Sequence, residues 1–82
     1  MIEFNKYAVG AVVKKIRKSK NMSQEVLSGL AGLARSHIAM IENSDKKANF
    51  ETIWKIANAF NIKPSKLVEM IENEIDLMKE TE

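Results

Sequence analysis

Apolar side chains recur at intervals of three and four residues through most of this 82-residue chain. This is the spacing of one buried face of an α-helix, and no segment shows the alternation of a strand. The pattern is interrupted near residues 20–22, at Gly32, at 43–48 and at 61–63. We therefore expect five helices in one all-α domain covering residues 1–82, with the first helix over about 5–20 and the fifth over about 64–80.

Local signals mark the ends of these helices. Ser23 and Asn49 are expected to cap the second and fourth helices, because their side chains accept the free backbone N–H groups of a first turn. Pro64 suits the first turn of the fifth helix, where its missing N–H is not needed. The apolar positions of the first, fourth and fifth helices then define their inner faces: Val9, Val12, Val13 and Ile16; Phe50, Ile53, Ile56, Ala57 and Phe60; Leu67, Val68, Ile71, Ile75 and Met78.

The second and third helices are close together in the sequence. Gly32 can adopt positive φ without a steric penalty, so the chain can reverse there and start a new helix near Ala34 or Arg35. Two short helices joined by such a turn form a helix-turn-helix, here over residues 23–42.

The third helix separates its side chains by angle. Ala34, Ile38 and Ile41 fall on one side and should face the core. The opposite side combines one cation, hydrogen-bonding groups, a thioether and a methyl group, a surface suited to base edges in a major groove. The expected base-reading residues are Arg35, Ser36, His37, Ala39 and Met40, with Arg35 facing guanine and Met40 a thymine methyl.

Charge is divided unevenly along the chain. Residues 1–63 hold 11 Lys and Arg against 5 Asp and Glu, whereas residues 64–82 hold 2 against 6. A basic body would attract phosphate and an acidic last helix would point away from it, although a merely solvated acidic face is the simpler alternative. Lys46 and Lys47 follow the third helix and are expected to contact the DNA backbone.

Composition excludes several classes of function. The chain has no cysteine and a single histidine, His37, so neither a metal site nor a cofactor is expected. It also has no glycine-rich phosphate loop and no Ser-His pattern, which argues against an enzyme. There is no small-molecule site evident, no apolar run approaches a membrane span, and no signal peptide is visible, so we expect a cytoplasmic protein.

These residues and their spacing resemble the lambda-repressor-like (Cro and xenobiotic-response-element type) helix-turn-helix family. The resemblance covers about residues 13–68 and is closest to the controller proteins of restriction-modification systems. It implies a compact five-helix DNA-binding fold and a transcriptional repressor or activator. The matching residues are Ile16-Arg17, Met22-Ser23-Gln24-Glu25, Leu27, Gly32-Leu33, Arg35-Ser36, Ile38, Ile41-Glu42-Asn43, Phe50-Glu51-Thr52-Ile53, Lys55-Ile56-Ala57 and Leu67.

The resemblance also implies roles for single residues. Arg17 and Glu42 are expected to form an ion pair between the first and third helices. Gln24 is expected to bind phosphate and brace the first recognition residue, and Asn43 and Lys47 are expected to contact the DNA backbone. Apart from the resemblance, Asn49 is also expected to bind phosphate. The chain departs from the family where Ala34 replaces a capping Ser or Thr, and where Ser44 and Ala48 replace Gly and Pro.

A single recognition helix covers only a few base pairs, so we expect a homodimer on a palindromic operator. The apolar residues of the fifth helix extend beyond what a five-helix monomer requires, which suggests a dimer interface there. The expected interface residues are Trp54, Phe60, Leu67, Ile71, Ile75 and Met78. The alternative is an antitoxin that binds DNA while a partner protein covers the C-terminal helix.

Overall fold

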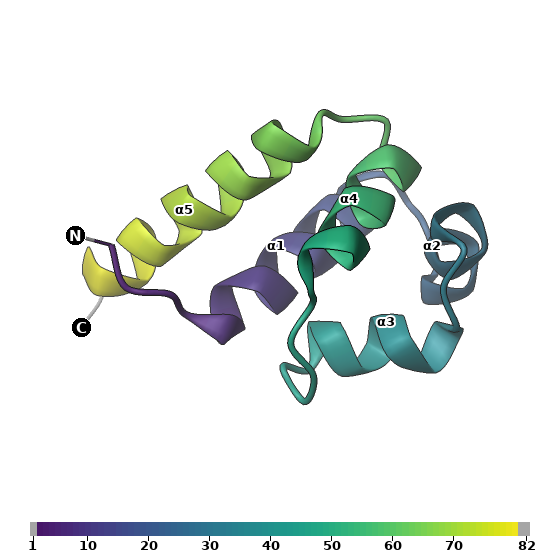
Figure 1. Cartoon of the computed structure of the whole chain (residues 1–82), viewed down its shortest axis with the longest axis horizontal. Coiled ribbons are helices and arrows are strands. Elements are labelled where there is room, and N and C mark those ends of the chain that lie inside the picture. The colour runs from purple at the N-terminus through teal and green to yellow at the C-terminus, as the bar shows by residue number, and fades with distance from the viewer. Residues whose placement is uncertain (1, 81–82) are drawn as a thin grey trace.

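The computed structural model describes residues 2–80, which form five α-helices and no strand. In chain order these are α1 (Lys6–Ser19), α2 (Gln24–Ala31), α3 (Arg35–Glu42), α4 (Phe50–Ala59) and α5 (Pro64–Glu80). Figure 1 shows α5 alongside α1 on one side of the molecule, with α2, α3 and α4 grouped on the other. The predicted all-α fold is confirmed.

The expected helix ends are also confirmed. Ser23 Oγ accepts a hydrogen bond from the Val26 backbone N–H at 3.0 Å, and Asn49 Oδ1 accepts one from Thr52 at 2.8 Å. Gly32 adopts φ 68° and ψ 34°, the left-handed conformation that ends α2. Pro64 is the first residue of α5. These ends are set by local chemistry, so the sequence alone predicts them.

Buried side chains from all five helices form one core cluster. α1 packs on α3 and α5, while α2 packs on α3 and α4, and α4 packs on α5. The fully buried large side chains at its centre are Val13, Leu27, Ile38, Ile41, Ile56, Phe60 and Leu67. Because α1 touches both α3 and α5, it connects the helix-turn-helix to the C-terminal half of the chain.

Most of the residues expected at the dimer interface already pack within the single chain. Phe60, Leu67, Ile71 and Ile75 are all buried within the single chain, each at most 8% exposed. Met78 packs on the edge of this core and accepts a hydrogen bond from the Asn5 side chain. The α5 side chains of this set are covered because α5 lies along α1. An ion pair also joins the two helices, with Lys15 Nζ 2.6 Å from Glu74 Oε1. Only Trp54 of the expected set is exposed.

Other apolar side chains lie outside the core, against expectation. Phe50 is 70% and Val68 43% exposed, although each shares a helix with buried neighbours. Ala34 is exposed because it precedes α3 in an extended conformation, so the helical angle does not apply to it. Val26 and Leu30, for which the sequence assigned no partner, also lie exposed on α2.

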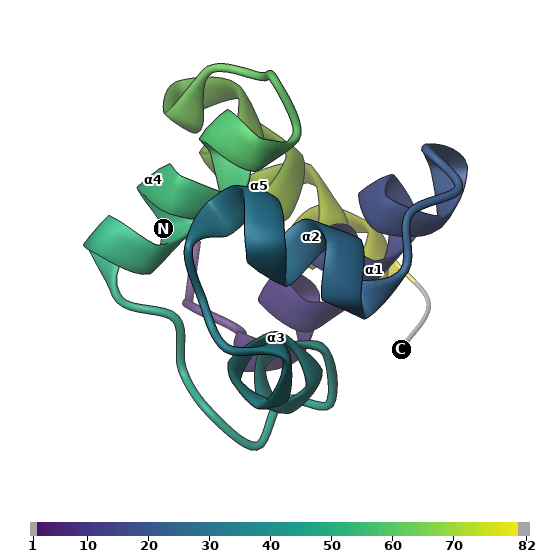
Figure 2. The same ribbon diagram turned by 90° about the vertical axis from the view of Figure 1, so that its right-hand side faces the viewer.

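The third helix occupies an edge of the molecule. Figures 1 and 2 show the other four helices together on one side of α3, leaving its opposite side facing outward. Among residues 2–80, no helix has the length and apolar character needed to cross a membrane.

Candidate nucleic-acid interface

The α3 helix presents a polar face outward. Ile38 and Ile41 are buried beneath it, whereas Arg35, Ser36 and Met40 are exposed. His37 and Ala39 are half-buried. The structure therefore brings the five expected base-reading residues together on the accessible side of α3. Ala34 provides no side-chain hydrogen bond to this helix, so its first-turn N–H groups lack the cap that Ser23 gives to α2.

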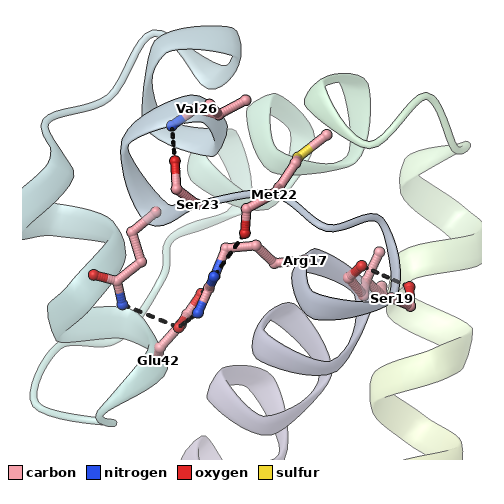
Figure 3. Close-up of polar contacts among 8 residues, drawn as sticks. Arg17, Ser19, Met22, Ser23, Val26 and Glu42 are labelled. Carbon is pink, nitrogen blue, oxygen red and sulfur yellow. Dashed lines mark hydrogen bonds and ion pairs between the residues drawn. The ribbon is translucent and has the colours of Figure 1, made fainter.

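A buried ion pair holds the other end of α3 (Figure 3). Arg17 Nε donates to Glu42 Oε2 at 2.7 Å and Arg17 Nη2 donates to Glu42 Oε1 at 3.0 Å. A third bond, 2.8 Å long, runs from Arg17 Nη1 to the Met22 carbonyl in the turn before α2. The two side chains are only 11% and 2% exposed. One guanidinium therefore connects α1, α3 and the start of α2, as a bidentate arginine geometry allows.

The charge state of Arg17 follows from this environment. The hydrogen bond to Glu42, and then its negative charge, raise the pKa of the Arg17 guanidinium against the opposing effect of burial. A raised pKa means that the stabilisation is complete below the ordinary arginine pKa and is lost only when the pH rises through the folded value. Arg17 therefore stays charged throughout the neutral range.

Gln24 is attached to the same pair. Its Nε2 donates to Glu42 Oε1 at 3.1 Å, which fixes the side-chain amide at the first residue of α2. An open hollow of about 600 Å³ is lined by Arg17, Ser23, Gln24, Glu25 and Arg35. Gln24 and Arg35 thus lie on one concave surface, where a phosphate contact by Gln24 and a base contact by Arg35 are compatible.

The loop after α3 supplies the other expected phosphate ligands. Asn43, Lys46, Lys47 and Asn49 are all exposed. The backbone N–H of Asp45 donates to the Met40 carbonyl at 2.8 Å, so the loop begins folded against the end of α3. The Asn49 side-chain oxygen caps α4, which leaves its amide nitrogen as the group able to donate to phosphate.

Two features of the structure were missed at the sequence level. Gly10 lies inside α1, and a Cβ added there would approach the end of α3 too closely. A glycine within a helix costs stability relative to alanine, and that cost is the signal that could have found it. The second feature is an apolar patch formed by Phe50, Trp54 and Val68.

This apolar patch surrounds a hollow of about 480 Å³ between α4 and the start of α5. Trp54 is 50% exposed, and its ring meets that of Phe50 edge-on at 5.9 Å between centroids. Exposed aromatic side chains grouped in this way are typical of protein interfaces. From the sequence, only Trp54 of this patch was expected at an interface, because the spacing of Phe50 and Val68 is compatible with core packing.

Comparison with known proteins is consistent with this geometry. The helix-turn-helix family model matches residues 13–67. The control protein C.BamHI from Bacillus amyloliquefaciens is 38% identical over 61 residues, covering 73% of this chain and 75% of the relative. The restriction-modification controller protein C.AhdI from Aeromonas hydrophila is 32% identical, with a TM-score of 0.72 over 76% of this chain and 94% of its own.

The controller protein C.Esp1396I has been solved as a tetramer in complex with its natural 35 base-pair operator. Its chain is 30% identical to this one, with a TM-score of 0.81 over 89% of this chain and 96% of its own. The family match covers more than half of this chain, and the relatives are matched over most of their lengths. The chain therefore belongs to the helix-turn-helix family, and within it groups with the control proteins of restriction-modification systems.

Proposed function

We propose that this protein binds duplex DNA sequence-specifically and regulates transcription of restriction-modification genes. The main support for this proposal is the outward face of α3. This helix lies at the edge of the molecule, with Arg35 and Ser36 exposed in its first turn. Arg35 is suited to two hydrogen bonds with guanine O6 and N7, and Met40 to a thymine methyl. Gln24, Asn43, Lys46, Lys47 and Asn49 contact phosphates on either side.

The protein acts as a binding protein rather than an enzyme, and its DNA target implies a cytoplasmic location. The named relatives support the regulatory role, because C.BamHI is a control protein and C.AhdI is a restriction-modification controller protein. The operator complex of C.Esp1396I supports duplex DNA as the target. None of the named relatives supports the antitoxin alternative.

The active form is a homodimer joined through the patch of Phe50, Trp54 and Val68. These side chains are the large apolar groups that α4 and the start of α5 leave in water. A two-fold axis through the patch would bury both copies of it and pair the two recognition helices. Two such helices one DNA turn apart, about 34 Å, require an inverted-repeat site.

Selection of bound sites from a random duplex library tests the proposal. We expect enrichment of an inverted repeat whose half-site centres lie about 10 base pairs apart. Affinity for that site should exceed affinity for a scrambled duplex by about 10³-fold or more at physiological salt. Failure to enrich any sequence, or equal affinity for both duplexes, would contradict sequence-specific regulation.

A further inference from the structure

The backbone of α1 comes unusually close to the end of α3 at Gly10. A Cβ built on Gly10 would lie 2.5 Å from the carbonyl oxygen of Ile41 and 2.8 Å from that of Glu42. Both neighbours are backbone atoms, which cannot swing aside as a flexible side chain would. Gly10 therefore sets the distance between the two helices at this point.

Arg17 contacts the same part of α3 from the same face of α1. Seven residues make nearly two helical turns, so Gly10 and Arg17 are almost aligned along α1. Gly10 lies against the backbone of Glu42, and Arg17 binds the carboxylate of Glu42. The last residue of the recognition helix is thus held by α1 through both its backbone and its side chain.

We propose that Gly10 is a positioning residue for DNA reading. Because Gly10 has no side chain, α3 can lie close enough to α1 for the outer face of α3 to be placed correctly against the bases. This inference rests on the proposed function. A methyl group at residue 10 would have to move α3 away from α1 by roughly 1 Å to restore ordinary contact. Binding residues must be held within about 0.5 Å of their working geometry, so that shift is large enough to matter.

The displacement would act selectively. Arg35, Ser36 and Met40 belong to α3 and move with it, whereas the backbone of Gln24 belongs to α2 and does not. Their relative positions on the DNA-facing surface would therefore change. Attraction of lysines to phosphate tolerates such a shift, because it depends on charge rather than on alignment. Base reading does not tolerate it.

The test compares Gly10→Ala with Gly29→Ala. Gly29 is an exposed helical glycine in α2 with no atom within 4 Å of an added Cβ, so it controls for the intrinsic effect of the substitution. Affinity is measured for the selected operator and for a scrambled duplex. We expect Gly10→Ala to lose about tenfold on the operator, as for one misaligned bidentate base contact, and to stay within about twofold on scrambled DNA.

Gly29→Ala should leave the ratio of the two affinities unchanged. Amide NMR chemical shifts provide a second readout. In Gly10→Ala the shifts should change along the length of α3, including residues far from residue 10, and should change little near the C-terminal end of α5. If Gly10→Ala is partly unfolded, both affinities are measured in trimethylamine N-oxide, which favours the folded state.

The outcomes separate the inference from the proposed function. Wild-type protein that binds both duplexes equally defeats the proposed function. Wild-type protein that prefers its operator, together with a Gly10→Ala variant whose preference is unchanged, defeats only the positioning role. A variant that fails to fold even in the osmolyte also overturns it, because Gly10 would then be required by the whole domain rather than by the seat of α3.

Discussion

Arg17 in α1 and Glu42 in α3 are joined by two hydrogen bonds, of 2.7 and 3.0 Å, in a contact almost closed to water. Both charges have lost most of their hydration, so each depends on the other for compensation. The pair therefore determines where α3 lies more than it adds net stability.

Replacing either partner alone by alanine should lower the free energy of unfolding by about 3–5 kcal/mol, because the remaining charge is buried without a counter-charge. The double variant Arg17→Met/Glu42→Leu should lose less than the two single losses combined. Denaturant unfolding measures all three. Lys66→Ala, at the exposed pair with Glu69, is the control and should cost at most about 1 kcal/mol. Additive losses in the double variant would contradict this interpretation.

Arg35→Ala should reduce affinity for the selected operator by about 1–3 kcal/mol, because a bidentate contact with one guanine is lost. Affinity for a scrambled duplex should fall much less. Fluorescence anisotropy with both duplexes at one salt concentration provides the comparison. Equal weakening on the two duplexes would make Arg35 a phosphate ligand rather than a base reader.

Lys46→Ala and Lys47→Ala should each weaken binding to every sequence by a similar factor. Each should also lower the slope of log affinity against log salt by about 1, because one phosphate contact and its released counterion are lost. Lys79→Ala, in the last turn of α5, is the matched control and should not change the slope. A slope that stays the same for Lys46 and Lys47 would identify them as solvated charges.

Trp54→Glu should convert the proposed dimer to a monomer, because a carboxylate would be buried in the apolar patch. Sedimentation at tens of micromolar compares it with wild type. Leu77→Glu is the control, since Leu77 is 53% exposed on α5 and does not line the patch. Wild type that is already monomeric, or a Trp54→Glu dimer, would exclude this interface. Substituting Ile71 or Ile75 instead would unfold the chain, because both are buried.

Ala34→Ser should raise the free energy of unfolding by about 1 kcal/mol, because α3 currently has no side-chain cap. The mirror variant is Ser23→Ala, which removes the existing cap of α2 and should cost a similar amount. Thermal unfolding of both variants measures the two effects. An Ala34→Ser protein no more stable than wild type would mean that the first turn of α3 gains no hydrogen bond from the added hydroxyl.

Much of the candidate site could be predicted from the sequence. The α3 side chains Arg35, Ser36 and Met40 follow from helical angle, which depends only on residue number within the helix. The Arg17–Glu42 pair joins residues 25 positions apart and was expected only from family resemblance. Periodicity could not have found it, because no local pattern specifies which distant charge a buried arginine will meet.

The helix ends follow from the sequence alone. Ser23, Gly32 and Pro64 act on their own backbone or on backbone groups a few residues away, so residue type alone predicts their effect. Periodicity likewise shows that a helix has an apolar face, but not which surface will cover it. Packing of α5 along α1 buried Ile71 and Ile75 inside one chain and left Phe50, Trp54 and Val68 exposed in their place. The close approach at Gly10 arises in the same way, because the partner of a helix face is chosen by the long-range contacts of the whole fold.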